Sequence, residues 1–521
     1  MELINYSDSI LSFVVPIVTI LLAITTGRVV ISLLSGALLG ALMLNGLSLD
    51  ALTYLWHTLS DIFISDGGID LWTLNIFLFL ILLGSTTALL TLNGATSAFA
   101  AWAHTKISTR RGASLLTVAL GIILFIDDYF NAIGVGAVSR PVTDSFKISR
   151  AKLAYLIDST SAPMVILTPI SSWGGYVIAL LGTTFAVHNL EIGALSAYVQ
   201  MVPMNFYAIL TIILVLYTAY TEFDIGLMRH HEEQARQGIL FDRKDDELDD
   251  DAHVKEGSHG RAYELFITIA LLVIITIFAL FYTGYLGLQA DGKSFEFVTA
   301  LEASDVGLAL VIGSGSSLLM AIIFSFGKEN TIKGVFVAIL KGSMTMKEAL
   351  IVLTAAWLIG SVIKDIQTGN YIATIVQEHL HMALLPALIF LLSAIMAFST
   401  GTSWGTFGIM IGITANIAMQ TDPTQILILL SAVLSGAVMG DHCSPISDTT
   451  ILSSIGAQAN HIDHVKTQIP YALLSGIAAL VGFLVIGYTG SLLIAWGISI
   501  IAFIAIIYVI KNSKFGPQTV R

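Results

Sequence analysis

The chain has 521 residues, of which 55% are hydrophobic and only 12% charged, and its mean hydropathy is +0.85. These values exclude an ordinary soluble enzyme and predict an all-α polytopic membrane protein. Half of the formal net charge of −12 comes from residues 221–262, which hold twelve acidic and six basic side chains. The charge therefore marks a solvated linker, and it gives no reason to expect a nucleic acid as partner.

Apolar stretches follow one another along the whole sequence. In chain order they are 9–25, 29–46, 71–92, 113–138, 153–188, 199–220, 263–287, 305–326, 348–363, 382–418, 424–456, 467–488 and 490–511. Several have the roughly 20 residues that a helix needs to cross a bilayer. Residues 113–138, 153–188, 382–418 and 424–456 contain polar clusters, so we expect them to form re-entrant hairpins or broken helices.

The distribution of Lys and Arg predicts the topology, because short cytoplasmic loops carry an excess of both. Residues 47–70 hold four Asp and no Lys or Arg, which places the N-terminus outside. Basic residues flank 113–138 on both sides, which predicts a hairpin that enters from the cytoplasm. No basic residue follows 382–418 directly, which predicts a hairpin from the outside, and the basic residues after 510 place the C-terminus inside.

This topology gives about 11 transmembrane helices in two inverted-topology repeats, each with a re-entrant hairpin and a broken helix. We expect the first repeat at 1–224, a charged cytoplasmic linker at 225–261, the second repeat at 262–489, and an extra C-terminal transmembrane helix and tail at 490–521. A chance likeness between Gly- and Ser-rich membrane segments is the alternative explanation. Inverted repeats with interrupted helices are typical of secondary transporters, whose site lies where the repeats meet.

Polar residues beside the expected breaks are the candidate ion or substrate ligands. They are Asp127, Asp128, Asn131, Asp158, Ser159, Ser161, Thr402, Ser403, Asp441, His442, Ser444 and Asp448. Carboxylates, hydroxyls and the backbone oxygens of a broken helix suit a small hard cation such as sodium. Asp158 and Asp441 stand at matching places in the two repeats, so we expect them to be the central ion or proton carriers.

Each candidate also has a structural interpretation. One of the adjacent Asp127 and Asp128 can lie at an interface and pair with an arginine, because neighbouring side chains point in different directions. Single Ser and Thr hydroxyls in membranes usually bond the backbone of their own helix. His442 is either a proton carrier or ion-pair partner, or else a hydrogen-bonded structural imidazole.

Other classes of site have weaker support. The histidines at 230, 231, 253 and 259 match no metal-ligand spacing. No Walker-type glycine loop indicates a nucleotide-driven pump, and no Gly-x-Ser-x-Gly motif indicates a hydrolase. We therefore expect neither an enzyme nor a cofactor, with sodium as the coupling ion.

The stretch Gly440-Asp441-His442-Cys443-Ser444-Pro445-Ile446-Ser447-Asp448-Thr449-Thr450 resembles the signature of the NhaC-type sodium/proton antiporters, within the ion-transporter superfamily. The resemblance extends through residues 127–163 and so touches both repeats. It implies a secondary transporter of the bacterial cytoplasmic (inner) membrane, surrounded by lipid and assembled as a homodimer. Asp158, Asp441 and Asp448 match acidic positions of the family's motifs, which implies a sodium site at these residues.

The sequence therefore predicts a sodium/proton antiporter that works by alternating access. A desolvated carboxylate favours its protonated form and a bound cation favours the ionised form, so one aspartate can exchange a proton for sodium. The resemblance also implies an alternative, since similar proteins carry small organic anions or amino acids. Aromatic residues near the clusters would suit such a substrate, namely Tyr129, Phe130, Trp173 and Trp404. A channel or receptor is disfavoured by the closed hairpins.

Overall fold

The computed structural model describes residues 3–26, 28–65, 67–95, 98, 101–102, 107–125, 128–169, 171–188, 190, 192–240, 260–326, 328, 330–367 and 382–513. Within these residues the chain is helical, apart from a small antiparallel hairpin in which β1 (Ile64–Ser65) pairs with β2 (Gly68–Ile69). The predicted helical membrane protein is confirmed, because many of the helices are also strongly apolar.

The helices of the first half are interrupted near residues 125 and 160. They are α1 (Val14–Thr26), α2 (Val29–Leu44), α3 (Asp50–Phe63), α4 (Leu71–Leu92), α6 (Arg110–Ile123), α7 (Asp128–Ser145), α8 (Arg150–Asp158), α9 (Ala162–Val165), α10 (Ser172–Val187), α11 (Ala194–Met201) and α12 (Phe206–Thr221). Helix α13 (Leu227–Arg236) then lies within the charged linker.

The helices of the second half are interrupted near residues 401 and 445. They are α14 (Ala262–Ala290), α15 (Phe297–Glu302), α16 (Val306–Ser325), α17 (Ile332–Thr345), α18 (Lys347–Asp365), α20 (Leu385–Thr400), α21 (Ser403–Thr421), α22 (Ile426–Cys443), α23 (Asp448–Ala457), α24 (His461–Thr489) and α25 (Leu492–Asn512). All four breaks fall inside the polar clusters where the sequence predicts them.

Seven helical segments of the described chain are long and apolar enough to cross a bilayer. They are Thr73–Leu92, Ala262–Ala290, Gly307–Ser325, Met382–Thr400, Pro423–Cys443, His461–Thr489 and Leu492–Asn512. An eighth is added if Ser196–Met204 and Phe206–Thr221, which meet at 54°, form one bent span. The structure does not support the expected count of about 11, because several apolar stretches fold as shorter pieces, such as the 16 residues of α2.

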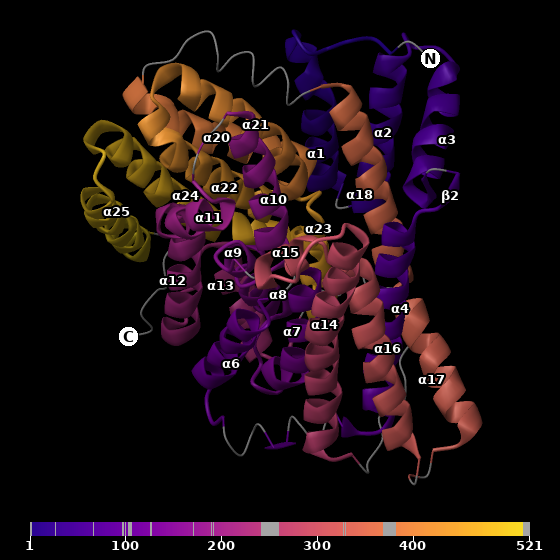
Figure 1. Cartoon of the computed structure of the whole chain (residues 1–521). Helices are drawn as coiled ribbons and strands as arrows, with labels where there is room; N and C mark the ends of the chain where they lie inside the picture. The colour runs from indigo at the N-terminus through magenta and orange to yellow at the C-terminus, as the bar shows by residue number, and fades with distance from the viewer. Residues whose placement is uncertain are drawn as a thin grey trace.

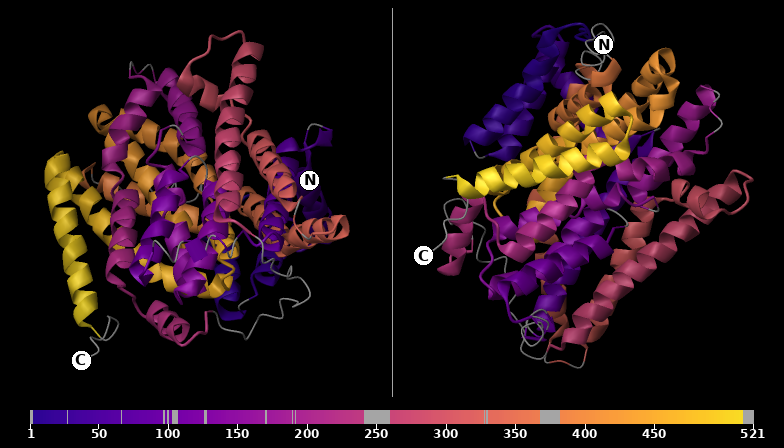
Figure 2. Two further views of the ribbon diagram at one scale, coloured as in Figure 1. Left: turned by 90° about the horizontal axis from the view of Figure 1, so that it is seen from below. Right: turned by 90° about the vertical axis from the view of Figure 1, so that its left-hand side faces the viewer.

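Helices α7, α8, α9 and α23 lie between two outer groups (Figures 1 and 2). On one side α16 and α17 pack on α4, while α2 and α3 pack on α18. On the other side α20 packs on α22, and α24 packs on α12 and α25. Helices α7, α8 and α23 contact one another in the middle of the molecule.

Close helix contacts hold this central region together. Gly456 of α23 approaches α7 so closely that a Cβ atom there would lie 2.5 Å from the carbonyl oxygen of Ala132. Gly401, which separates α20 from α21, has φ +67°, and a Cβ there would lie 2.5 Å from the carbonyl oxygen of Ile446. Glycine tolerates both the left-handed backbone and the close approach. The two glycines therefore bring the hairpin segments onto the second broken helix.

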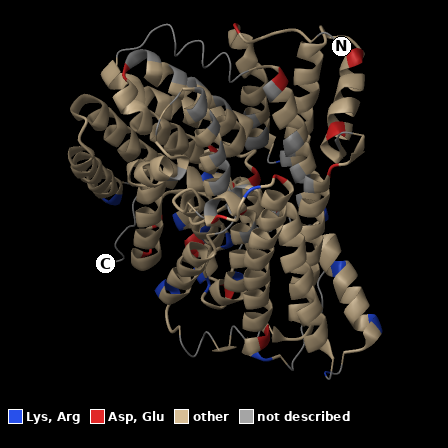
Figure 3. Ribbon diagram, viewed as in Figure 1, with Lys and Arg blue, Asp and Glu red and all other residues tan. Residues whose placement is uncertain are grey.

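Lys and Arg are unevenly distributed along the molecule, whereas Asp and Glu occur in both halves. In the view of Figure 3, Lys and Arg gather in the lower half, on α6 and α17 among others. The upper end, near the N-terminus, is marked by Asp and Glu. The lower end is therefore the more basic of the two.

The linker is more structured than the sequence predicts. Helix α13 buries Met228, Glu232 and Ala235 against the helices around it, including α8 and α24. Glu232 accepts a hydrogen bond from the backbone nitrogen of Ser149 at 2.8 Å and pairs with the Arg110 guanidinium. The interpretation of residues 221–240 as wholly solvated is therefore wrong, and residues 241–259 lie outside the described part.

Candidate ion site at the helix breaks

Asp158, the last residue of α8, is fully buried and lies at the break near residue 160. Its Oδ2 atom accepts hydrogen bonds from Thr450 Oγ1 at 3.1 Å and from Gln468 Nε2 at 2.5 Å, and it lies 3.2 Å from His464 Nε2. Its Oδ1 atom has no hydrogen-bond partner among the described residues. Three donors thus orient one oxygen of the carboxylate and leave the other available.

The two broken helices meet directly at His442. The Nε2 atom of His442 lies 3.3 Å from Ser159 Oγ, and its Nδ1 atom lies 2.6 Å from Tyr207 Oη on α12. Together with the bond between Thr450 and Asp158, this contact confirms that the stretches around residues 158 and 441 are neighbours. Both nitrogens of the His442 ring have partners, which favours the hydrogen-bonded structural role for this imidazole.

Asp441 lies in the last turn of α22 and is 1% exposed. Its Oδ2 atom accepts hydrogen bonds from the Oγ atom of Ser403 at 2.6 Å and from the backbone nitrogen of Ser403 at 3.2 Å. Since Ser403 is the first residue of α21, the carboxylate sits at the N-terminus of a half-helix, where the backbone dipole favours negative charge. Asp441 Oδ1 has no partner in the described chain.

The first hairpin reaches the second broken helix through Tyr129. Its hydroxyl donates to Asp448 Oδ2, while Asp448 Oδ1 accepts from the backbone nitrogen of Thr449 at 2.9 Å. Asp448 is the first residue of α23 and is only partly buried. The two hairpins therefore hold two carboxylates of the same broken helix, Tyr129 at Asp448 and Ser403 at Asp441.

Asn131 connects helices α6 and α7 to the break near residue 160. Its amide nitrogen donates to the carbonyl oxygens of Gly121, Leu124 and Thr160 at 2.6, 3.1 and 3.2 Å. Its Oδ1 atom is buried and has no partner among the described residues. Ser161 Oγ donates to the carbonyl oxygen of Asp128 at 2.9 Å, so the hydroxyl is used within the framework.

The remaining predicted residues have structural roles or fall outside the described residues. Ser444 Oγ donates to the carbonyl oxygen of Phe398 at 2.8 Å, which holds the second break against α20. The Thr402 carbonyl oxygen accepts a hydrogen bond from Thr406 Oγ1 at 3.0 Å. Asp128 is buried at the start of α7. Asp127 lies outside the described residues, as does any contact it makes.

Sequence reasoning missed three residues that bond the central groups. They are Tyr207, His464 and Gln468. The apolar stretch expected at 467–488 is part of a helix that begins at His461, so His464 lies before the expected span. The missed signal is the i, i+4 pair of polar residues on a helix that is otherwise apolar.

Buried oxygens without donors are the distinguishing feature of this region. They are Asp158 Oδ1, Asp441 Oδ1, Asn131 Oδ1 and Gln468 Oε1. Each unsatisfied acceptor costs roughly 1–3 kcal/mol of desolvation, and a cation or a proton relieves that cost. Within the described part of the chain, no group of three or more His, Cys, Asp or Glu side chains is arranged to hold a metal ion. Any cation bound here would therefore depend on amide oxygens as well as carboxylates, and both are oxygen ligands of the type that hard cations prefer.

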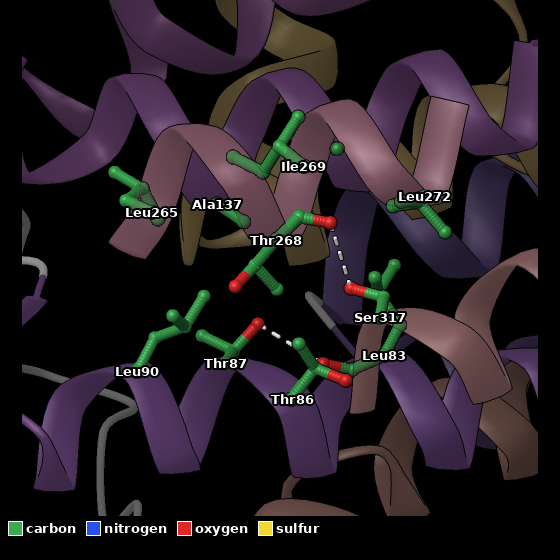
Figure 4. A pocket seen from close by; sticks show the side chains of 11 residues that line it. Leu83, Thr86, Thr87, Leu90, Ala137, Leu265, Thr268, Ile269, Leu272 and Ser317 are labelled. Atoms are coloured by element: carbon green, nitrogen blue, oxygen red, sulfur yellow. Dashed lines mark hydrogen bonds between the residues drawn. The ribbon is translucent and has the colours of Figure 1, made fainter. Parts of the chain in front are cut away.

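A separate pocket has a different character. It lies between α4, α7, α14 and α16, and Figure 4 shows its lining of leucines and hydroxyls. Thr87 Oγ1 donates to the carbonyl oxygen of Leu83 at 3.1 Å, and Ser317 Oγ donates to that of Thr268 at 3.2 Å. These hydroxyls are used by backbone carbonyls, so the pocket offers little to an ion.

Comparison with known proteins identifies the family. The model described as "Na+/H+ antiporter family" matches residues 164–488, which include Asp441 and Asp448 and begin after Asp158. The chain is 44% identical, over 98% of its length and 97% of the relative, to an uncharacterized protein of Haemophilus influenzae.

Shorter stretches resemble two antiporters of organic solutes. One is the malate-2H(+)/Na(+)-lactate antiporter of Bacillus subtilis, 29% identical over 29% of this chain and 32% of that protein. The other is the arginine/ornithine antiporter of Halobacterium salinarum, 35% identical over 21% of this chain and 22% of that protein. Because the family model covers more than half of the sequence, this chain belongs to the Na+/H+ antiporter family.

Proposed function

We propose that this protein is a sodium/proton antiporter that works by alternating access. The observation that carries the proposal is the set of buried oxygens without donors, of which Asp158 Oδ1 and Asp441 Oδ1 belong to carboxylates. A carboxylate oxygen of this kind accepts either a sodium ion or a proton, and occupancy by one excludes the other. Exchange follows when the occupied site turns from one side of the membrane to the other, carrying sodium in one direction and a proton in the opposite direction.

Asp158 and Asp441 are the proposed carriers, and Asp448 is a third proposed sodium ligand. Asp158 accepts hydrogen bonds from Thr450, His464 and Gln468 on one of its oxygens. Asp441 accepts a hydrogen bond from Ser403. These donors fix the carboxylates without neutralising them.

The proposed architecture is two inverted repeats, at 1–224 and 262–489, joined by the linker at 225–261 and followed by an extra helix at 490–521. Reciprocal helix contacts support it. Helix α4 packs on α16 and α17 while α18 packs on α2 and α3, and α7 packs on α23 while α10 packs on α21. Likewise α12 packs on α22 and α24 on α8. Such an exchange of partners is expected when two copies of one unit pack in opposite orientation.

We further propose an orientation with the N-terminus outside and the C-terminus inside a bacterial cytoplasmic membrane, and assembly as a homodimer. The end of the molecule that carries α6 and α17 is richer in Lys and Arg (Figure 3), which supports a cytoplasmic position for that end.

The second candidate function is the sodium-coupled exchange of an amino acid or a small carboxylate. Two partial relatives are named for such solutes. In addition, the buried Trp173 packs at 6.2 Å from Trp404 and 5.7 Å from Phe407 between ring centroids, and its indole nitrogen has no acceptor among the described residues. An unpaired donor of this kind suits an organic anion better than sodium.

Proteoliposomes separate the two functions. A sodium gradient imposed without any organic solute is expected to move protons in the opposite direction, as recorded by a pH dye in the lumen. Asp441→Asn is expected to abolish that movement. Proton movement that appears only after malate, lactate, arginine or ornithine is added would contradict the first function and support the second.

A further inference from the structure

Helix α24 presents a polar stripe to the two breaks. His464, Gln468, Tyr471 and Ser475 recur at the spacing of one helix face, and each is at most 1% exposed. This face packs against α8, α12, α22 and α23. A polar stripe buried inside an apolar helix is costly in a membrane, so its members need partners or a ligand.

Both hydrogens of the Gln468 amide are donated to acceptors. Its Nε2 atom donates to Asp158 Oδ2 at 2.5 Å and to the carbonyl oxygen of His442 at 2.7 Å. Because neither neighbouring atom is a donor, the nitrogen rather than the oxygen of the amide must face them. The Oε1 atom is left as the other polar atom of the amide, and it is buried with no partner among the described residues.

The amide thereby joins the two broken helices. Asp158 ends α8 and His442 lies in the last turn of α22, so one side chain of a third helix connects both breaks. The connected carboxylate leaves Asp158 Oδ1 without a donor, in the same way as Gln468 Oε1. Two buried acceptors without donors thus belong to directly bonded side chains, and both are oxygens of the kind that hard cations prefer.

We propose that Gln468 is a sodium ligand through Oε1 and, through Nε2, the residue that positions Asp158 for the same ion. This inference rests on the proposed sodium/proton exchange and adds the residue that separates the two ions. An amide oxygen ligates sodium but is not protonated near neutral pH, whereas the carboxylate of Asp158 serves both ions. Loss of Gln468 Oε1 therefore weakens sodium binding and leaves proton binding at Asp158 in place.

The test measures sodium-driven proton flux in proteoliposomes at several pH values. Gln468→Met keeps the length of the side chain and removes both amide functions. The apparent KM for sodium is expected to rise about tenfold or more, as for the loss of a bond to a charged group. The apparent affinity for protons is not expected to fall, because loss of the Nε2 donor favours the protonated carboxyl of Asp158. Gln468→Glu restores an oxygen and is expected to recover sodium affinity at high pH, with a pH profile that includes the added carboxyl.

Thr467→Val is the matched control, because Thr467 is equally buried and its hydroxyl bonds the carbonyl oxygens of Asp463 and His464 in its own helix. Its KM for sodium is expected to equal that of the wild type. A Gln468→Met variant with an unchanged KM for sodium, or with a loss of maximal rate alone, would overturn the proposal. If that variant does not fold, Gln468→Glu decides by its pH profile, and a profile identical to the wild type overturns the proposal. Absence of exchange in the wild type would instead refute the proposed function.

Discussion

The buried ion pair between Lys152 and Asp224 offers a quantitative test of how the broken helix is anchored. The two side chains are 3% and 7% exposed, and Nζ lies 2.8 Å from Oδ1. The ammonium also lies 5.2 Å and 5.5 Å from the ring centroids of Tyr155 and Tyr471. Removal of one partner from such a pair leaves an uncompensated buried charge and costs about 3–5 kcal/mol. We expect this loss for Asp224→Asn and for Lys152→Met, with up to about 2 kcal/mol of the lysine's loss coming from the rings.

The double variant is the discriminating measurement. With both charges removed, no charge is left without compensation, so the expected loss is smaller than either single loss. Denaturant titration in detergent micelles gives the free energies of unfolding. The exposed pair of Lys293 and Asp291, at 3.1 Å with side chains 65% and 59% exposed, is the matched control, and Lys293→Met is expected to change stability by less than about 0.5 kcal/mol. Losses that simply add in the double variant would refute the reasoning.

Three further predictions concern the hairpin contacts and the linker. Gly456→Ala places a methyl group against the Ala132 carbonyl oxygen and is expected to cost about 1–3 kcal/mol in thermal unfolding, unlike Gly412→Ala, where the space is open. Tyr129→Phe removes the donor to Asp448 and is expected to lower thermal stability and transport rate; wild-type values in both assays would exclude a role for this bond. Burial raises the pKa of the Glu232 carboxyl. Docking of α13 should therefore weaken as the pH rises through that pKa. Hydrogen exchange of the α13 amides, corrected for the intrinsic effect of pH on exchange, measures this change. Glu232→Gln should remove the pH dependence.

The positions of the breaks could be predicted from the sequence, because they depend on local chemistry. Gly401 and the Asp441 stretch interrupt apolar runs with residues that a membrane helix tolerates poorly, and the structure ends α20 and α22 there. The pairing of the stretches at 158 and 441 followed from the inferred topology. The contact itself is confirmed by the bonds of Ser159 with His442 and of Thr450 with Asp158.

The partners of the carboxylates could not be predicted in the same way. Gln468 reaches Asp158 across 310 positions of sequence, and only the packing of α24 against α8 brings them together. The helical linker segment was also missed, since charge counting treats residues 227–236 as solvated and does not reveal that Glu232 is buried. The predicted count of about 11 spanning helices is not supported for a related reason. Composition cannot show where a long apolar stretch is bent or divided.

The most direct test of the central claim is proton release on sodium binding by the purified protein. In weakly buffered detergent solution, addition of sodium chloride to the wild type is expected to release protons that a pH dye records, while choline chloride releases none. Asp158→Asn and Asp441→Asn are expected to reduce or abolish the release, because sodium and protons compete for these carboxylates. Sodium binding without proton release, or release that is unchanged in both variants, would contradict the account.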